Sequence, residues 1–146
     1  MKSPRRRARE FAMQGLYQWL MAGGAAADIA EQIRADKHFD QADDAFFGVL
    51  LNGAIGAGPE LDAALTPYLD RPIAEVTPIE RAILLLGAYE LRDRIETPYR
   101  VIVNEAIELA KTFGGTDGHR YINGVLDKLA PALRRSEVDA HVVRAQ

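Results

Sequence analysis

The segment from Thr77 to Asp93 constrains the fold most strongly, because it predicts a helix that must be buried. Thr77-Pro78-Ile79-Glu80 has the pattern of a capping box with proline in the first helical position. The residues that follow are apolar on nearly every side of a helix, namely Ile83, Leu84, Leu85, Leu86, Ala88 and Leu91. A helix without a polar face has to be covered all round. We therefore place it at the centre of the fold.

The rest of the chain shows helical periodicity, and no stretch alternates convincingly with the period of two that is typical of a strand. A first helix ends at Gly23-Gly24, and a short one follows at about 26–35. A third helix is expected after an N-cap at Asp40, and a brief one begins at Pro59. In the second half, one helix is expected from Thr97-Pro98 to Gly114-Gly115. The last one runs from an N-cap at Thr116 to a kink or end at Pro131.

These patterns predict an all-α fold, a single compact domain of six to seven helices. We expect two packed helical sub-bundles at about residues 1–67 and 68–135, followed by a polar tail at 136–146 that frays. The chain of 146 residues is 48% hydrophobic and 27% charged and has no cysteine, so neither a disulfide framework nor a thiolate metal site is expected. It has no stretch of the about 20 apolar residues that a membrane span needs and no apolar core of a secretory signal, so we expect a cytoplasmic protein without membrane contact.

The chain shows little that is typical of an enzyme. Its only serines, Ser3 and Ser136, lie near the ends, and His38, His119 and His141 are too far apart for a zinc motif. Gly53-x-x-Gly56-x-Gly58 reverses the order of a dinucleotide-binding fingerprint and follows a helical pattern. Glu105 and Glu108 are expected to be solvated. We predict no catalytic site, no metal and no cofactor.

The N-terminal segment is strongly basic, and we call Lys2, Arg5, Arg6, Arg7 and Arg9 the basic head. Without them, 13 lysines and arginines remain against 21 aspartates and glutamates, so residues 10–146 carry a net charge of −8. Cations at a helix N-terminus oppose the helix dipole, so folding gains nothing from them there. The alternative is a solvated, disordered terminus. We favour an anion-binding surface, with nucleic acid as the foremost ligand.

Helical phase supports this interpretation. At 100° per residue, Arg5 and Arg9 lie above Ala12, Leu16 and Leu20, in line with the apolar stripe of the first helix. The first turns are therefore expected to extend beyond the core and to present guanidinium groups in a row. Arginine suits phosphate because its planar fork donates two hydrogen bonds to one group.

Four motifs carry a resemblance to a known family. They are the N-terminal run 5–17 (RRRAREFAMQGLY), the central helix with Ile79-Glu80-Arg81-Ala82-Ile83-Leu84 and Tyr89-Glu90-Leu91, the segments 97–101 (TPYRV) and 104–111 (NEAIELAK), and the run 113–128 (FGGTDGHRYINGVLDK). In these residues the chain resembles the NusB family of bacterial transcription antitermination factors. The resemblance extends to about Arg135, in family order and spacing.

The resemblance implies a non-catalytic adaptor that pairs with NusE, a small ribosomal subunit protein. Together they bind single-stranded boxA RNA and, with other Nus factors, act on RNA polymerase, chiefly at ribosomal RNA operons. It assigns RNA binding to the basic head and to Asp117 and Tyr121. It assigns the NusE side to Tyr17, Glu80 and Glu75.

Several of these residues also have a purely structural explanation. The ring of Tyr121 can stack on an unpaired base or pack in the core. Asp117 can interact with the N-terminus of its helix, and Glu80 can close the capping box. The same choice between contacting RNA and packing stays open for Phe113, His119 and Asn123.

Two other functions remain as alternatives. One is an RNA-binding domain related to that of a ribosomal-RNA cytosine methyltransferase, an enzyme that needs a further catalytic domain. The other is a helical interaction protein without RNA. The sequence also leaves open whether the chain forms a homodimer that covers its arginines.

Overall fold

The computed structural model describes residues 2–115 and 117–145, and this part of the chain contains eight α-helices and no strand. The α-helices are α1 (Pro4–Ala22), α2 (Ala26–Arg34), α3 (Asp44–Gly56), α4 (Gly58–Leu65), α5 (Pro78–Asp93), α6 (Tyr99–Phe113), α7 (Gly118–Leu133) and α8 (Arg135–Ala145). Three short 3-10 helices, η1 (Phe39–Gln41), η2 (Thr66–Tyr68) and η3 (Ile73–Glu75), lie in the connections. The all-α prediction is confirmed, with more helices than the six to seven expected.

Helix α5 is the centre of the fold, as its sequence predicts. Every residue from Ala82 to Leu91 is buried, because α1, α3, α4, α6 and α7 all pack against this helix. The predicted N-cap is present, since the Thr77 hydroxyl oxygen accepts a hydrogen bond from the Glu80 backbone N–H at 3.3 Å. The return bond of a capping box differs from the expected one, to the Thr77 backbone N–H. The Glu80 carboxylate accepts from the same hydroxyl at 3.0 Å.

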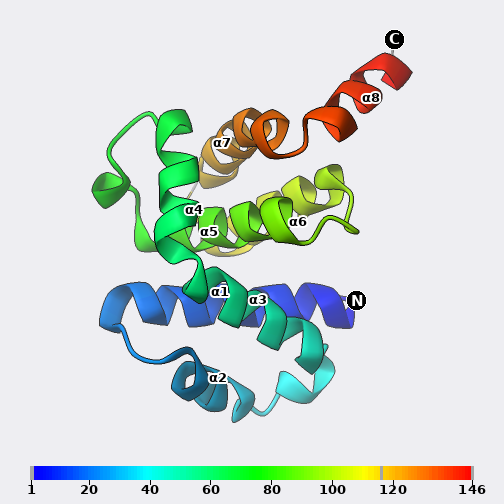
Figure 1. The fold of residues 1–146 in the computed structure, drawn as a ribbon. Helices are drawn as coiled ribbons and strands as arrows, with labels where there is room; N and C mark the ends of the chain where they lie inside the picture. The colour runs from blue at the N-terminus through cyan, green and yellow to red at the C-terminus, as the bar shows by residue number, and fades with distance from the viewer. Residues whose placement is uncertain (1, 116, 146) are drawn as a thin grey trace.

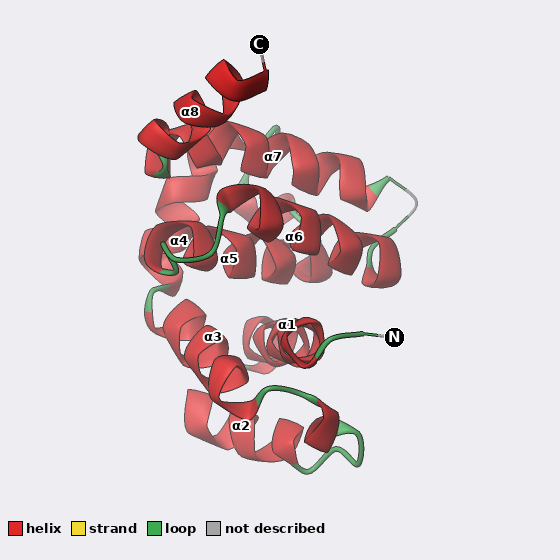
Figure 2. Ribbon diagram, turned by 90° about the vertical axis from the view of Figure 1, so that its right-hand side faces the viewer, coloured by secondary structure: helices red, strands yellow, loops and turns green. Residues whose placement is uncertain are grey.

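The helices gather on two sides of the molecule. Figure 2 shows α1, α2 and α3 in the lower part, and α4 to α8 in the upper part. Helices α1 and α3 pack on one another and on α5, which joins the two groups. Helix α4 packs on α5 and α7, so it lies with the second group although it precedes the boundary expected near residue 67.

A glycine allows α3 to lie directly on α5. A Cβ atom added at Gly53 would overlap the ring of Tyr89 on α5. The glycine therefore serves close packing of two helices, since no side chain of any size fits there. This gives a structural role to a residue of the Gly53-x-x-Gly56-x-Gly58 sequence.

One predicted helix start differs from the structure. Asp43, not Asp40, caps α3: its carboxylate accepts from the Phe46 N–H at 3.0 Å, whereas Asp40 lies in η1. Helix α6 begins where Thr97-Pro98 predicts it, with Pro98 at the N-cap position, and the Tyr99 N–H donates to the Glu137 carboxylate at 2.7 Å. The predicted cap Thr116 lies outside the described residues.

The C-terminal segment is helical where a frayed polar tail was expected. Helix α7 continues through Pro131 to Leu133, and α8 follows at once. The reason is a contact that no local pattern reveals, because Glu137 on α8 is tied to the start of α6. In Figure 1, α8 lies at the end of α7 and leads away from the other helices. No helix among the described residues has both the length and the apolar character needed to cross a membrane.

Candidate nucleic-acid interface

The four arginines of the basic head lie in the first two turns of α1, so they are held on a helix, whereas Lys2 precedes it. Ser3 caps this helix, its hydroxyl oxygen accepting from the Arg6 N–H at 3.1 Å, and Pro4 occupies the first helical position. This is a regular helix start. The five cations nevertheless have very different surroundings.

Arg9 is buried, contrary to the expected exposed row. It is only 4% exposed, and its guanidinium binds the Glu90 carboxylate of α5 through Nε at 2.9 Å and Nη2 at 2.8 Å. Glu90 is 2% exposed. Each charge needs the other there, because an unpaired buried charge is very costly. The first turns of α1 therefore lie against the core instead of extending beyond it.

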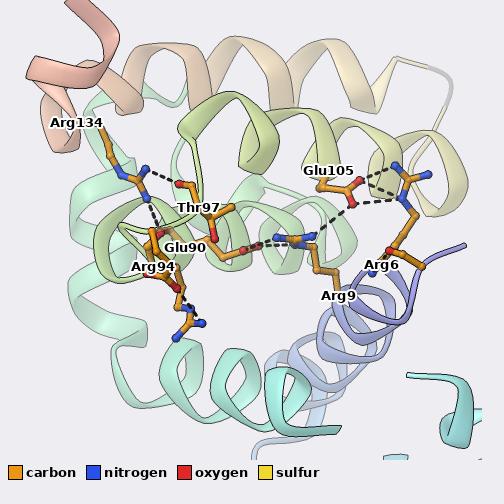
Figure 3. Close-up of polar contacts among 9 residues, drawn as sticks. Arg6, Arg9, Glu90, Arg94, Thr97, Glu105 and Arg134 are labelled. Atoms are coloured by element: carbon orange, nitrogen blue, oxygen red, sulfur yellow. Dashed lines mark hydrogen bonds and ion pairs between the residues drawn. The ribbon is translucent and has the colours of Figure 1, made fainter. Parts of the chain in front are cut away.

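Arg6 forms the outer part of the same network (Figure 3). Its Nη2 lies 2.8 Å from Glu105 Oε2, and its Nε donates to the same oxygen at 3.1 Å. Glu105 also accepts from Arg9 Nη1 at 3.4 Å, so two arginines share one carboxylate. The hydrogen bond and the charge of Glu105 raise the pKa of Arg6. The expectation that Glu105 is solvated was wrong, because its side chain is largely covered by these arginines.

The remaining cations of the basic head are more accessible. Lys2 pairs with Glu10 at 2.8 Å, and both side chains reach the surface. The guanidinium carbon of Arg5 lies 3.7 Å from the centre of the Phe46 ring, a cation–π contact that leaves Arg5 exposed. Within the described residues, Arg7 has no ion pair and no side-chain hydrogen bond. Arg5 and Arg7 are therefore the two cations of the basic head that no carboxylate among the described residues neutralises.

The start of α7 carries the other predicted RNA residues. Asp117 is exposed and makes no side-chain hydrogen bond to the helix N-terminus; it lies 4.0 Å from Arg120. Tyr121 is half-buried, with the Arg71 guanidinium 4.7 Å from the centre of its ring. His119 is also half-buried, and Asn123 lines a hollow together with residues of α6.

The two parts of the predicted RNA surface do not touch, but they share one side of the molecule. Lys2 and Arg6 line a hollow with Thr112 near the end of α6, whereas Tyr121 lines another with Tyr68 and Asp70. In Figure 2 the N-terminus and the connection from α6 to α7 lie on the same side. A strand of RNA that contacts both has to pass the C-terminal end of α6.

Two of the three residues predicted to meet a protein partner come together. Tyr17, which is 38% exposed, lines a hollow with Glu80 and Phe113. Phe113 is half-buried there, against the core and the hollow. Glu75 is exposed at the end of η3 and does not line this hollow.

The sequence interpretation missed two buried residues, Glu90, which holds Arg9, and Arg134, which binds the end of α5. Glu90 carries a signal in hindsight, because a carboxylate within an apolar helix needs a cation. Arg134 has no such signal. It is buried and donates to the carbonyls of Glu90, Leu91, Arg94 and Thr97 at 2.7–3.0 Å (Figure 3). It thereby holds the end of α5 to the turn that follows it; the carbonyls of Glu90 and Arg94 also accept from the backbone N–H groups of Arg94 and Thr97.

Comparisons with known proteins find related sequences over nearly the whole chain. The family model described as NusB family matches residues 6–131. The transcription antitermination protein NusB of Paraburkholderia xenovorans is 53% identical over 140 residues, 96% of this chain and 97% of that protein. The protein of the same name from Burkholderia mallei is 54% identical over 139 residues, 95% of this chain and 96% of that protein.

Solved structures show the same fold. A structure of T. maritima NusB has a TM-score of 0.83 and 27% identity, and the match covers 95% of this chain and 99% of that one. A structure of NusB and NusE in complex with double-stranded RNA has a TM-score of 0.77 and 23% identity, over 87% of this chain and 96% of that one. At that identity the second match is informative about the fold alone.

Proposed function

The chain belongs to the NusB family, and from this premise we propose that it is a transcription antitermination factor. It acts as an adaptor without catalysis of its own: it pairs with NusE and binds single-stranded boxA RNA in nascent transcripts, notably those of ribosomal RNA operons. It reaches RNA polymerase through other Nus factors. Because bacterial transcripts are made in the cytoplasm, we place its action there.

The observation that carries the RNA-binding part is the pair Arg5 and Arg7. Both are held on the first turns of a capped helix, and neither is paired with a carboxylate among the described residues. Their charges gain nothing from the helix dipole. A phosphate backbone supplies the missing counter-charge, and its binding releases counterions. Arg9 belongs to the buried network and is left out of the proposed RNA surface, whereas Lys2 and Arg6 join it only when RNA displaces Glu10 and Glu105.

The second part of the RNA surface is the start of α7, with Asp117 and Tyr121. The start of α7 lies on the same side of the molecule as the N-terminus, which supports one continuous path for the RNA strand over both. The basic head attracts any RNA, so we assign selectivity for boxA largely to NusE and to the α7 end.

The proposed NusE side is the hollow between α1, the start of α5 and the end of α6. Tyr17 presents an exposed ring there, and Glu80 adds a carboxylate. Glu75 lies outside the hollow and would meet NusE only at its rim. Aromatic residues are enriched at the centres of protein interfaces, which suits Tyr17.

A binding titration tests this proposal. Labelled boxA RNA is titrated with the chain, with NusE present and absent, and with a scrambled RNA as the sequence control. We expect tight binding only for boxA with both proteins. Replacing Arg5 and Arg7 together by alanine should weaken binding about tenfold, since two phosphate contacts are lost.

The matched control removes two arginines that lie away from the basic head. Arg100 and Arg135 are exposed at the starts of α6 and α8, so their double alanine variant has the same change in net charge. It should bind boxA RNA like the unmodified chain. Equal losses in the two double variants would point to a general charge effect and would count against a site at the basic head.

A further inference from the structure

Arg71 lies on the ring of Tyr121, although the two residues are far apart in sequence. It occupies the connection between η2 and η3, whereas Tyr121 lies near the start of α7. Its guanidinium carbon is 4.7 Å from the centre of the Tyr121 ring. The neighbouring Asp70 holds the guanidinium from the side, accepting from Nε at 2.6 Å and from Nη2 at 2.9 Å.

This contact changes what Tyr121 can offer to RNA. The ring is half-buried, and Arg71 already covers one face of it. The phenol oxygen is buried and makes no hydrogen bond of standard geometry. Burial, and then the nearby charge of Asp70, raise the pKa of Tyr121, so it stays neutral. A base stacks directly on this face of Tyr121 only if Arg71 moves away.

The guanidinium of Arg71 is itself a planar stacking surface. Its side chain is 40% exposed. Asp70 binds the edge of the group through Nε and Nη2, so that this ion pair does not obstruct the planar face directed away from Tyr121. Nη1 makes no hydrogen bond among the described residues. Unpaired RNA bases stack on arginine planes as well as on aromatic rings.

The surroundings favour a base over a phosphate at this position. Asp70 neutralises Arg71, so the pair has no net charge with which to attract an anion. Arg120 and Lys128 are exposed and line the same hollow as Tyr68, Asp70 and Tyr121. They supply cations for the RNA backbone beside the stack.

We propose that Arg71 forms a binding site for one unpaired RNA base, with Tyr121 supporting the guanidinium from below and Asp70 fixing its orientation. The base stacks on the outer face of Arg71, and Arg120 and Lys128 contact the adjoining phosphates. This inference rests on the proposed RNA-binding function, and it names Arg71 as the group that contacts the base.

The test uses the full chain with NusE and labelled boxA RNA. Arg71→Ala should weaken binding about 5- to 100-fold, the range for loss of one base stack. Arg71→Lys keeps the charge but lacks the plane, so it should lose about as much. The control is Arg92→Ala. Arg92 also pairs with a sequence neighbour through Nε and Nη2, at 3.0 and 2.7 Å from Asp93, but lies on α5 away from this hollow. It should bind like the unmodified chain.

A second measurement locates the base. A series of boxA RNAs is prepared, each with a single abasic nucleotide at a different position. The affinity of each RNA is measured for the unmodified chain and for Arg71→Ala. Loss of the base at one position should weaken binding to the unmodified chain. The same loss should not weaken binding to Arg71→Ala any further, because that variant has already lost the stacking contact. Circular dichroism checks that the helical signal is retained in every variant.

The outcomes separate the inference from the proposed function. If Arg71→Lys binds normally while Arg71→Ala does not, Arg71 acts as a charge and the stacking site is overturned. If both Arg71 variants bind normally while the Arg5 and Arg7 double variant is weakened, only the inference fails. If the unmodified chain with NusE does not select boxA RNA, both are overturned.

Discussion

Arg9 and Glu90 form an ion pair with two parallel hydrogen bonds, of 2.9 and 2.8 Å, almost wholly inside the protein. It joins the first helix to the central one, across 81 residues of sequence. Glu105 extends it to Arg6 at the surface. One end of the basic head thus serves the fold, and the other end is open to a ligand.

Breaking the buried pair on one side should be strongly destabilising. Glu90→Ala removes the main partner of the buried Arg9 and leaves it only the longer contact with Glu105, at 3.4 Å, so it should lower the free energy of unfolding by about 3–5 kcal/mol. The double variant Arg9→Met with Glu90→Leu replaces both charges by apolar groups and should recover most of that loss. Urea denaturation measures both. A double variant as unstable as the single one would contradict this account.

The same double variant tests the place of Arg9 in RNA binding. Because Arg9 is not in the proposed RNA surface, the double variant should bind boxA RNA with NusE as tightly as the unmodified chain does. A loss as large as that of the Arg5 and Arg7 double variant would return Arg9 to the RNA surface.

Removing the charge of Glu105 should strengthen RNA binding. Glu105 competes with RNA phosphates for Arg6, and a partly exposed ion pair is worth about 0.2–1 kcal/mol. Glu105→Gln keeps an oxygen that accepts from Arg9 and should raise affinity about two- to fivefold. Its matched control is Glu108→Gln on the same helix, whose carboxylate forms its ion pair with Lys111, at 3.8 Å, and acts on Arg6 only through its charge.

The gain should depend on Arg6. In an Arg6→Ala background, Glu105→Gln should change affinity no more than Glu108→Gln does. Equal gains from both substitutions in the unmodified chain would mean that only the overall charge matters.

The salt dependence of RNA binding should report the number of open cations. For single-stranded RNA each phosphate contact contributes about −0.7 to the slope of log affinity against log salt. Loss of Arg5 and Arg7 should therefore make the slope shallower by about 1.4. An unchanged slope would show that these two arginines do not contact phosphates.

Glu137 should make the stability of the C-terminal helix depend on pH. Burial acts to raise its pKa, but the Tyr99 N–H and the Arg134 guanidinium outweigh it and hold the pKa below the usual 4.5. The stabilisation is therefore complete above the unfolded pKa and is lost as pH falls through the lower folded value. The difference in unfolding free energy between the chain and Glu137→Gln should be constant near neutral pH and shrink below about pH 4.5. A difference that grows on acidification would refute the assignment.

Close packing at Gly53 should make it intolerant of a side chain. Gly53→Ala forces its new methyl group into the Tyr89 ring, so α3 and α5 have to shift, at a cost of about 1–3 kcal/mol. Gly56→Ala on the same helix meets no atom within 4 Å and should change stability by less than about 0.5 kcal/mol. Thermal denaturation of the two variants separates packing from a general effect of helix propensity.

Helix positions could be predicted where the signal is local. The capping box at Thr77 and the apolar run after it define α5, and the double glycine at Gly23 ends α1. The predictions that were wrong, for the C-terminal segment and for the N-cap of α3, depend on contacts between distant residues. Helix α8 forms although its sequence is polar, because Glu137 caps α6 from outside that helix. Asp40 and Asp43 are equally good caps by residue type, and only the packing of Phe39 and Phe46 into the core selects Asp43.

The all-α fold, the central helix and the cationic N-terminus follow from the sequence alone, since each depends on the periodicity and charge of neighbouring residues. Which of the cations are free depends on how distant segments pack. Arg5 and Arg9 are one helical turn apart and equivalent in any local pattern. Yet Arg5 lies on the Phe46 ring and stays exposed, whereas Arg9 meets Glu90 and is buried. The same holds for Tyr121, whose partner Arg71 comes from another part of the chain. Whether a cation is free or paired, and whether a ring is open or covered, depends on groups that folding brings to it from distant parts of the sequence.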